Sequence, residues 1–138
     1  MASLTSAIGD WLGQPVQNEL ELANVVLRGL PLGVSNTLIE HGLTKEEFHG
    51  IVIPIRTFKH RKSRVEHLSP EESDRAVRTA RVLAYAERVF ADREKGLSWM
   101  RKAKKRFNDL APMQMLQTEA GARLVEQMLT QIDDGMFA

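Results

Sequence analysis

The feature that most limits the fold of this 138-residue chain is the spacing of its apolar side chains. They recur three and four residues apart along most of the length, which is the period of an α-helix. The alternation typical of strands is nearly absent, because the apolar run Ile51-Val52-Ile53 is too short to form a useful strand. The sequence therefore predicts an all-α protein.

Helix start and stop signals divide the first half of the chain. Residues 1–18 hold three helix breakers around a single Trp-Leu pair, which favours a flexible arm with at most one helical turn. Apolar spacing predicts helices over 19–28 and about 34–40. Thr44 and Glu47 form a capping box for a helix that reaches about Ile51, and Pro54 can stand at the start of the next one. These two segments form a helix, a short turn and a second helix.

The second half begins with a strong start signal, since Ser69 can cap a helix whose first position is Pro70. That helix should run to about residue 92. Its apolar stripe, from Ala76 to Phe90, is either a dimer surface or core. Shorter helices should follow, and the last should end at Gly135. We expect four segments: a flexible arm (1–18), a helix-turn-helix domain (19–68), a linking or dimerisation helix (69–94) and a C-terminal module (95–138).

Composition excludes several classes of protein. The chain has no cysteine, so disulfides and thiolate metal sites are excluded, and its four histidines have no ligand spacing. No apolar run is long enough to span a membrane, and the first residues lack the features of a secretory signal, so we expect a cytoplasmic protein. No pairing of nucleophile and base indicates an enzyme.

The net charge of +1 hides clusters of one sign. Residues 56–64 and 101–106 are basic without an intervening acid, whereas 119–134 are mainly acidic. Sorted charge of this kind favours separate surfaces for separate partners. We interpret 101–106 as a solvated connector between helices.

The first basic cluster follows the predicted turn, where the second helix of a helix-turn-helix enters the major groove of DNA. Ile55 and Phe58 could pack inward against Phe48 and Ile51. The candidate DNA-binding residues are then Arg56, Thr57, Lys59, His60, Arg61 and Arg64. A solvated basic helix face would give the same pattern, and Val52 and Phe48 depart from the usual motif.

The C-terminal residues suggest a partner. Beyond Gly135, Met136 and Phe137 are apolar and have almost no chain left to cover them. A buried Phe contributes about 2–3 kcal/mol, so the tail gains by inserting into a partner's pocket. The same residues could instead fold back on their own domain.

An ordered series of motifs carries a resemblance to a known family. These are Trp99-Met100, Pro112, the Thr118-to-Gly121 step, the apolar side of the last helix, the ending Gly135-Met136-Phe137-Ala138 and, upstream, Ile53–Arg61 and Leu68–Arg75. Over roughly residues 20–138 the chain resembles Xre/MbcA/ParS antitoxins, with a helix-turn-helix domain and a C-terminal toxin-binding domain. Met100 stands where the family usually has Leu, and 104–109 replace its Asn-Pro turn.

The resemblance implies an antitoxin of a type II toxin–antitoxin system. Its toxin would be a RES-domain enzyme that consumes NAD, inhibited when the C-terminal helix and tail cover its NAD pocket. The antitoxin would repress its own operon, as a homodimer and without a cofactor. The expected toxin-binding residues are Arg123, Gln127, Gln131, Asp134, Gly135, Met136, Phe137 and Ala138. A stand-alone transcription regulator whose C-terminal domain only oligomerises is the alternative, with a small enzyme as a third.

Overall fold

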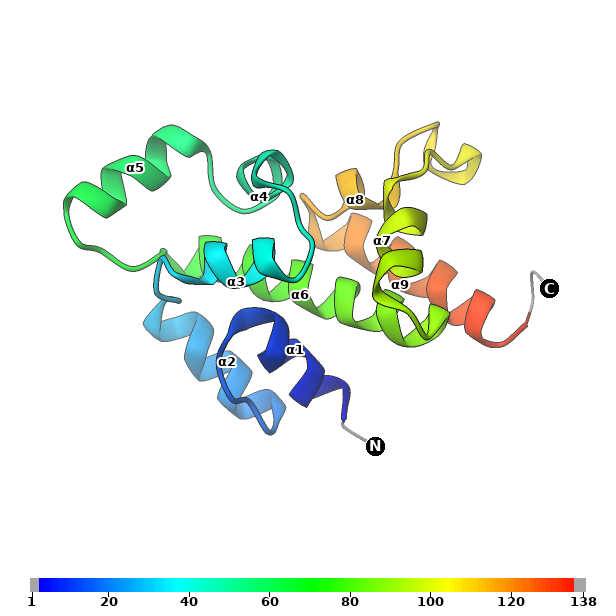
Figure 1. Cartoon of the computed structure of the whole chain (residues 1–138), viewed down its shortest axis with the longest axis horizontal. Coiled ribbons are helices and arrows are strands. Elements are labelled where there is room, and N and C mark those ends of the chain that lie inside the picture. The colour runs from blue at the N-terminus through cyan, green and yellow to red at the C-terminus, as the bar shows by residue number, and fades with distance from the viewer. Residues whose placement is uncertain (1–2, 136–138) are drawn as a thin grey trace.

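The longest helix, α6 (Pro70–Phe90), starts where the sequence predicts. The Ser69 hydroxyl accepts a hydrogen bond from the Glu72 backbone N–H, and the Glu72 carboxylate accepts one from the Ser69 backbone N–H. This capping box satisfies two backbone donors that the first helical turn leaves free. In the computed structural model, α6 crosses the middle of the molecule, with α3–α5 on the left and α7–α9 on the right (Figure 1).

The structure describes residues 3–135, and within that range every regular element is a helix. The predicted bounds of α2 and α3 are confirmed, as is the capping box of Thr44 and Glu47. In chain order the elements are α1 (Leu4–Leu12), α2 (Glu19–Arg28), α3 (Val34–Glu40), α4 (Lys45–Ile51), α5 (Ile55–Ser63), α6, α7 (Arg93–Arg101), the 3₁₀ turn η1 (Lys105–Phe107), α8 (Pro112–Met115) and α9 (Glu119–Asp133). None of the described helices is long and apolar enough to cross a membrane.

The apolar stripe of α6 forms the core of the protein. Ala76, Ala80, Val82 and Leu83 are each at most 2% exposed. The helix packs against α1, α2, α4, α7 and α9 of the same chain. Because these neighbours already cover the stripe, its interpretation as a dimer surface is wrong.

The interpretation of residues 1–18 as a loose arm is also wrong, since α1 is a nine-residue helix. The Ser3 hydroxyl caps it by accepting a hydrogen bond from Ser6 N–H at 3.1 Å. Trp11 and Leu12 are each 2% exposed and lie in the core. Gly9, which sequence reasoning took as a breaker, lies so close to the following turn that a Cβ would come 2.4 Å from Gln14 O. Close packing therefore explains this glycine, and burial stabilises the helix.

Two glycines shape the start and the end of the last helix. A Cβ on Gly121 would lie 2.1 Å from Met115 O, so only glycine allows α9 to start this close to α8. Gly135 has φ +80°, the left-handed conformation that follows a helix end. The helix α9 runs for 15 residues, from Glu119 to Asp133, toward the C-terminal end of the described chain.

The basic segment 101–106 is more ordered than a solvated connector. Arg101 makes a two-bond ion pair with Glu47 of α4, with both N–O distances 2.9 Å. The Lys104 ammonium lies 4.8 Å from the centre of the Trp99 ring, and Arg106 donates to Gln131 of α9 at 3.2 Å. These contacts tie the segment to both halves of the molecule.

Candidate nucleic-acid and partner interfaces

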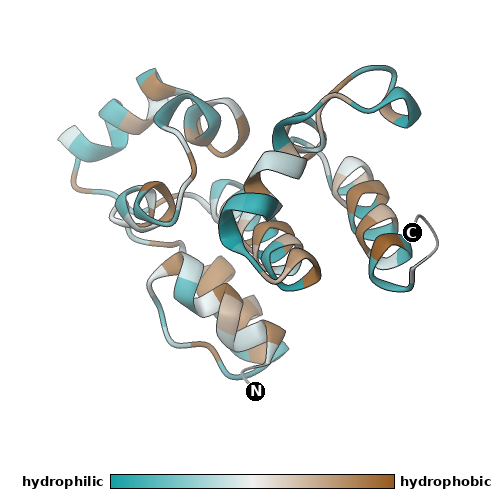
Figure 2. Cartoon of the chain, turned by 45° about the vertical axis from the view of Figure 1, so that its right-hand side comes forward, coloured by the Kyte–Doolittle hydropathy of each residue, from teal (hydrophilic) through white to brown (hydrophobic). Residues whose placement is uncertain are grey.

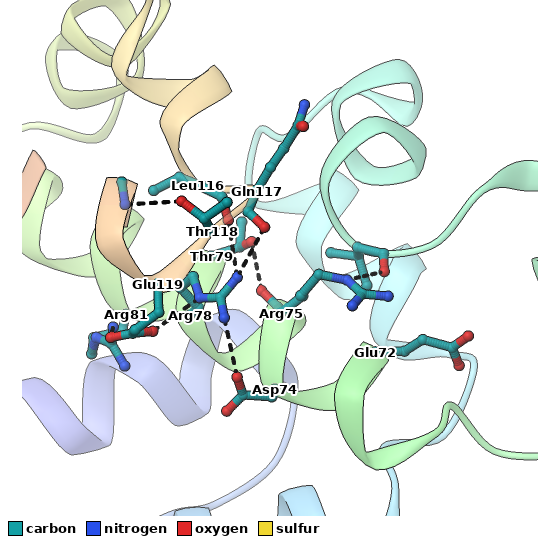
Figure 3. Close-up of polar contacts among 12 residues, drawn as sticks. Glu72, Asp74, Arg75, Arg78, Thr79, Arg81, Leu116, Gln117, Thr118 and Glu119 are labelled. Atoms are coloured by element: carbon teal, nitrogen blue, oxygen red, sulfur yellow. Dashed lines mark hydrogen bonds and ion pairs between the residues drawn. The ribbon is translucent and has the colours of Figure 1, made fainter. Parts of the chain in front are cut away.

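The turn between α4 and α5 is held from inside the protein. Val52 and Ile53 are each 1% exposed, so the turn is anchored by its own apolar side chains. Arg75 of α6 donates from Nε to the Val52 carbonyl oxygen at 2.9 Å (Figure 3). That bond satisfies a carbonyl at the end of α4 that has no partner within the helix.

Aromatic contacts fix the orientation of α5. The rings of Phe48 and Phe58 meet edge to face with centroids 5.9 Å apart, and His49 lies 5.3 Å from Phe58. Ile55, which we expected to pack inward with Phe58, is 45% exposed and does not belong to the core. It occupies the first position of the helix, and only Phe58, one turn later, is directed at α4.

Most of the predicted DNA-binding side chains lie on the outside of α5. Arg56, Lys59, His60 and Arg64 are exposed and Thr57 is half-buried. Within the described part of the chain, no ion pair engages Arg56, Lys59 or Arg64. These three cations are therefore available to phosphates or base edges.

Arg61 is placed differently from the other predicted residues. Its Nε and Nη2 donate to the two carboxylate oxygens of Glu72 at 2.8 and 3.1 Å, and Glu66 lies 3.6 Å away. Glu72 is only 6% exposed. Two parallel bonds of this kind are strong and directional, so Arg61 holds the end of α5 to the start of α6.

The same pair makes part of the stability depend on pH. Burial raises the pKa of Glu72, but hydrogen bonds from Arg61 and from the Ser69 backbone lower it by more. The net pKa is therefore below the usual glutamate value. Because the pKa of Glu72 is lower in the folded than in the unfolded state, its ionised carboxylate stabilises the fold. This contribution is complete at pH values above the unfolded-state pKa and is lost as the pH falls through the folded-state pKa.

We therefore expect Glu72→Gln to lower the free energy of unfolding at pH 7 by about 2 kcal/mol, because the amide keeps the helix cap but loses the charge. The difference from wild type should shrink below roughly pH 4.3. Urea denaturation at several pH values measures both effects. Glu71→Gln, next to it and exposed, is the control. A difference that stays constant down to pH 3 contradicts the assignment.

Val65, just after α5, has a strained backbone. Its φ of +56° lies in the left-handed region, which a β-branched residue adopts at a cost of about 1–2 kcal/mol. The side chain is 91% exposed and gains nothing from packing.

Val65→Gly should therefore raise the free energy of unfolding by about 1 kcal/mol, because glycine tolerates this conformation. Lys62→Gly, inside α5, serves as the opposite control and should lower it by a similar amount. Thermal and urea denaturation report both changes. A destabilised Val65→Gly protein would show that Val65 is not strained.

The last helix, α9, has one buried and one open side. Val125, Met128 and Leu129 are buried, and Figure 2 shows apolar and polar bands alternating along α9 beside the C-terminus. Arg123 and Gln127 are exposed and Gln131 is half-buried. Because they are four residues apart, they form one row, and all three line a shallow pocket with Glu126 and Thr130.

The structure places five of the eight predicted partner-binding residues along α9 and directly after it. Asp134 and Gly135 are exposed and continue the row of Arg123, Gln127 and Gln131. The predicted contacts of Met136, Phe137 and Ala138 lie outside the described residues. Sequence reasoning missed Leu124, which is 47% exposed next to this row. Because Leu124 occupies an apolar position in the helical pattern, the sequence predicted that it would be buried.

A buried arginine joins α6 to α9, and sequence reasoning missed it too. Arg78 is 8% exposed. Its guanidinium donates to Glu119 at 3.0 Å, to Asp74 at 3.2 Å and to the Leu116 carbonyl at 3.3 Å (Figure 3). Arg81, one turn later, pairs with Glu119 and Glu126, both at 3.2 Å. The only sequence signal is an arginine within the apolar stripe of α6, four residues after an aspartate.

Titratable side chains of the described residues form no group of three that could hold a metal ion. The described surface has two distinct polar features: exposed cations on α5 and a polar row on α9. Both surfaces are connected through α6.

Comparison with known families also divides the chain into two parts. Residues 21–81 match the model of the antitoxin Xre-like helix-turn-helix domain, and residues 86–135 match the antitoxin Xre/MbcA/ParS C-terminal toxin-binding domain. The chain belongs to the Xre/MbcA/ParS family of antitoxins. The helix-turn-helix match thus ends inside α6, and the toxin-binding-domain match begins near the end of the same helix.

Curated relatives carry the same description. The antitoxin Xre of Pseudomonas putida is 44% identical over 98 residues, which cover 71% of this chain and 62% of that protein. The antitoxin Xre of Yersinia enterocolitica is 27% identical over 140 residues, covering 99% of this chain and 95% of that protein. In Photorhabdus laumondii, the antitoxin Xre is 32% identical over 87 residues, or 62% of this antitoxin and 59% of its relative.

Proposed function

We propose that this antitoxin neutralises a RES-domain toxin that consumes NAD, and that α9 and the residues after it cover the toxin's NAD pocket. The observation that supports the proposal is the exposed row on α9, which leads directly to Gly135 and the apolar tail. Inhibition of this kind is steric and needs no catalytic group in the antitoxin. The resemblance of the sequence implies both the toxin class and its substrate.

The proposal gives α5 the second role. Arg56, Lys59 and Arg64 contact the operator of the antitoxin's own operon, with Thr57 and His60 on the same helix. The antitoxin acts here as a homodimer, because one helix-turn-helix reads only a half-site. Residues 69–94, which contain α6, then link the DNA-binding segment 19–68 to the toxin-binding segment 95–138.

Deleting Met136–Ala138 tests the first role. The tail carries one phenylalanine whose burial contributes about 2–3 kcal/mol, so its loss should weaken toxin binding roughly 30- to 150-fold. In cells that co-express a RES-domain toxin encoded beside the antitoxin gene, NAD should fall again. Arg56→Ala is the control, since it leaves the toxin-binding half intact.

The outcome also separates the two functions that the sequence left open. If truncated and full-length antitoxin protect NAD equally, the tail does not cover the pocket. If neither protects NAD while operator binding persists, the chain is a stand-alone transcription regulator.

A further inference from the structure

One face of α2 is apolar and uncovered. Leu20 and Leu27 are 70% and 72% exposed, whereas Leu22 and Val25, on the opposite side, are buried. Leu20 and Leu27 are seven residues apart and therefore lie in one line along the helix, with the small exposed side chain of Ala23 between them. Two large apolar side chains this exposed on a single helix are typical of an interaction surface.

A line of charge runs beside the apolar line. Glu21 and Arg28 are also seven residues apart, on the flank next to Leu20 and Leu27. Glu19 makes the first turn of α2 more acidic, and Arg28 is the last residue of the helix. Within residues 3–135 no carboxylate pairs with Arg28. The helix thus has an acidic end and a basic end on the flank beside its apolar line.

We infer that a second copy of this chain docks on this face, with the two α2 helices antiparallel about a two-fold axis near Ala23 and Asn24. In that arrangement Leu20 faces Leu27 of the second copy, and Glu21 faces its Arg28. A two-fold interface must be self-complementary in this way. A parallel arrangement would instead set the two acidic ends side by side.

The neighbouring surface extends the same interface. Ala23 and Leu27 line a groove between α2 and α6, together with Val77 of α6. Ala23 has no bulky side chain, so the two helix backbones can approach closely at the axis. The inference rests on the proposed homodimer and gives it a surface in place of the α6 stripe, which is buried.

Cysteine cross-linking tests the arrangement directly, because the chain contains no cysteine. In the full-length protein, Ala23→Cys lies beside its own copy across the axis, within the Cα separation of about 4–7 Å that a disulfide needs. Mild oxidation should therefore give a covalent dimer. Glu40→Cys, exposed on α3, is the control and should stay monomeric on a denaturing gel.

The direction of the helices has its own test. Leu20→Cys and Leu27→Cys should cross-link with each other when the two proteins are mixed, and each should cross-link poorly alone. If Leu20→Cys cross-links to itself as readily as to Leu27→Cys, the antiparallel arrangement is overturned. If the wild-type protein is dimeric by sedimentation but Ala23→Cys gives no covalent dimer, the inferred surface is overturned. The homodimer itself would then still stand.

Sedimentation equilibrium measures the strength of the contact. Leu27→Asp should raise the dimer dissociation constant at least ~100-fold, because it places a carboxylate against leucine. Arg28→Glu should raise it roughly tenfold, and Glu21→Lys combined with Arg28→Glu should restore it. Unchanged association of Leu27→Asp overturns the inference. A wild-type protein that stays monomeric at high concentration overturns both the inference and the proposed homodimer.

Discussion

Replacing Arg78 by alanine is expected to lower the free energy of unfolding by about 3 kcal/mol. The reason is that the guanidinium is buried and supplies hydrogen bonds to groups on α6, on α9 and in the turn before α9. Alanine would leave the Leu116 carbonyl without this donor and Glu119 with Arg81 alone. Part of the loss is the empty volume left by a long side chain in the core.

Urea denaturation of the full chain measures this change. Arg64→Ala is the matched control, since Arg64 is exposed and makes no ion pair among the described residues, and its effect should stay within about 0.5 kcal/mol. If Arg78→Ala and Arg64→Ala unfold at the same urea concentration, Arg78 does not hold α6 to α9.

The second large effect concerns DNA. Changing Arg56, Lys59 and Arg64 together to alanine should weaken operator binding at least ~100-fold, since each contact with a phosphate or base edge contributes about 1–3 kcal/mol. The three side chains are exposed on α5, which is anchored through Phe58 rather than through them. The fold and toxin neutralisation should both persist.

A control triple removes the same charge elsewhere. Lys95, Lys102 and Lys105 are exposed on the other half of the chain, and their replacement by alanine should leave operator affinity within a few-fold of wild type. Gel-shift titrations at two salt concentrations report affinity and its salt dependence, which should be less steep in the α5 triple. If the two triples lose affinity equally, binding depends on net charge and α5 is not the contact surface.

Arg61 has a different role from the exposed Arg56 and Arg64. Its bidentate pair with Glu72 makes it a positioning residue, so its replacement should lower stability as well as operator affinity. The position of α5 therefore depends on α6 at two points, through Arg61 and through the Arg75 bond to Val52. One helix thus holds the turn between α4 and α5 and, through Arg78, the start of α9.

The sequence predicted those elements whose signals are local. The bounds of α2 and α3, the capping box of Thr44 and Glu47 and the Ser69 cap of α6 are right because they depend on residues within a few positions of one another. The α1 helix was missed because Gly9 is explained only by a turn that folds back on it, and Trp11 by a core built from distant segments. Propensity gives no account of such tertiary stabilisation.

The candidate surfaces, too, could be predicted from the sequence only where local patterns determine them. Exposed cations on α5 could be predicted from charge and helical spacing, but the different position of Arg61 depends on an ion pair with a residue eleven positions away. The role of Arg78 depends on Glu119, which lies 41 positions along the chain. Buried pairs of this kind leave no periodic pattern, so only the folded structure distinguishes them from exposed charges.

The most direct test of the account is the NAD concentration in cells that express a RES-domain toxin encoded beside the antitoxin gene. With the full-length antitoxin co-expressed, NAD should remain at the level of cells without toxin, and the two proteins should purify together. NAD that falls equally with and without the antitoxin, while the toxin is present and active, would contradict the proposed function.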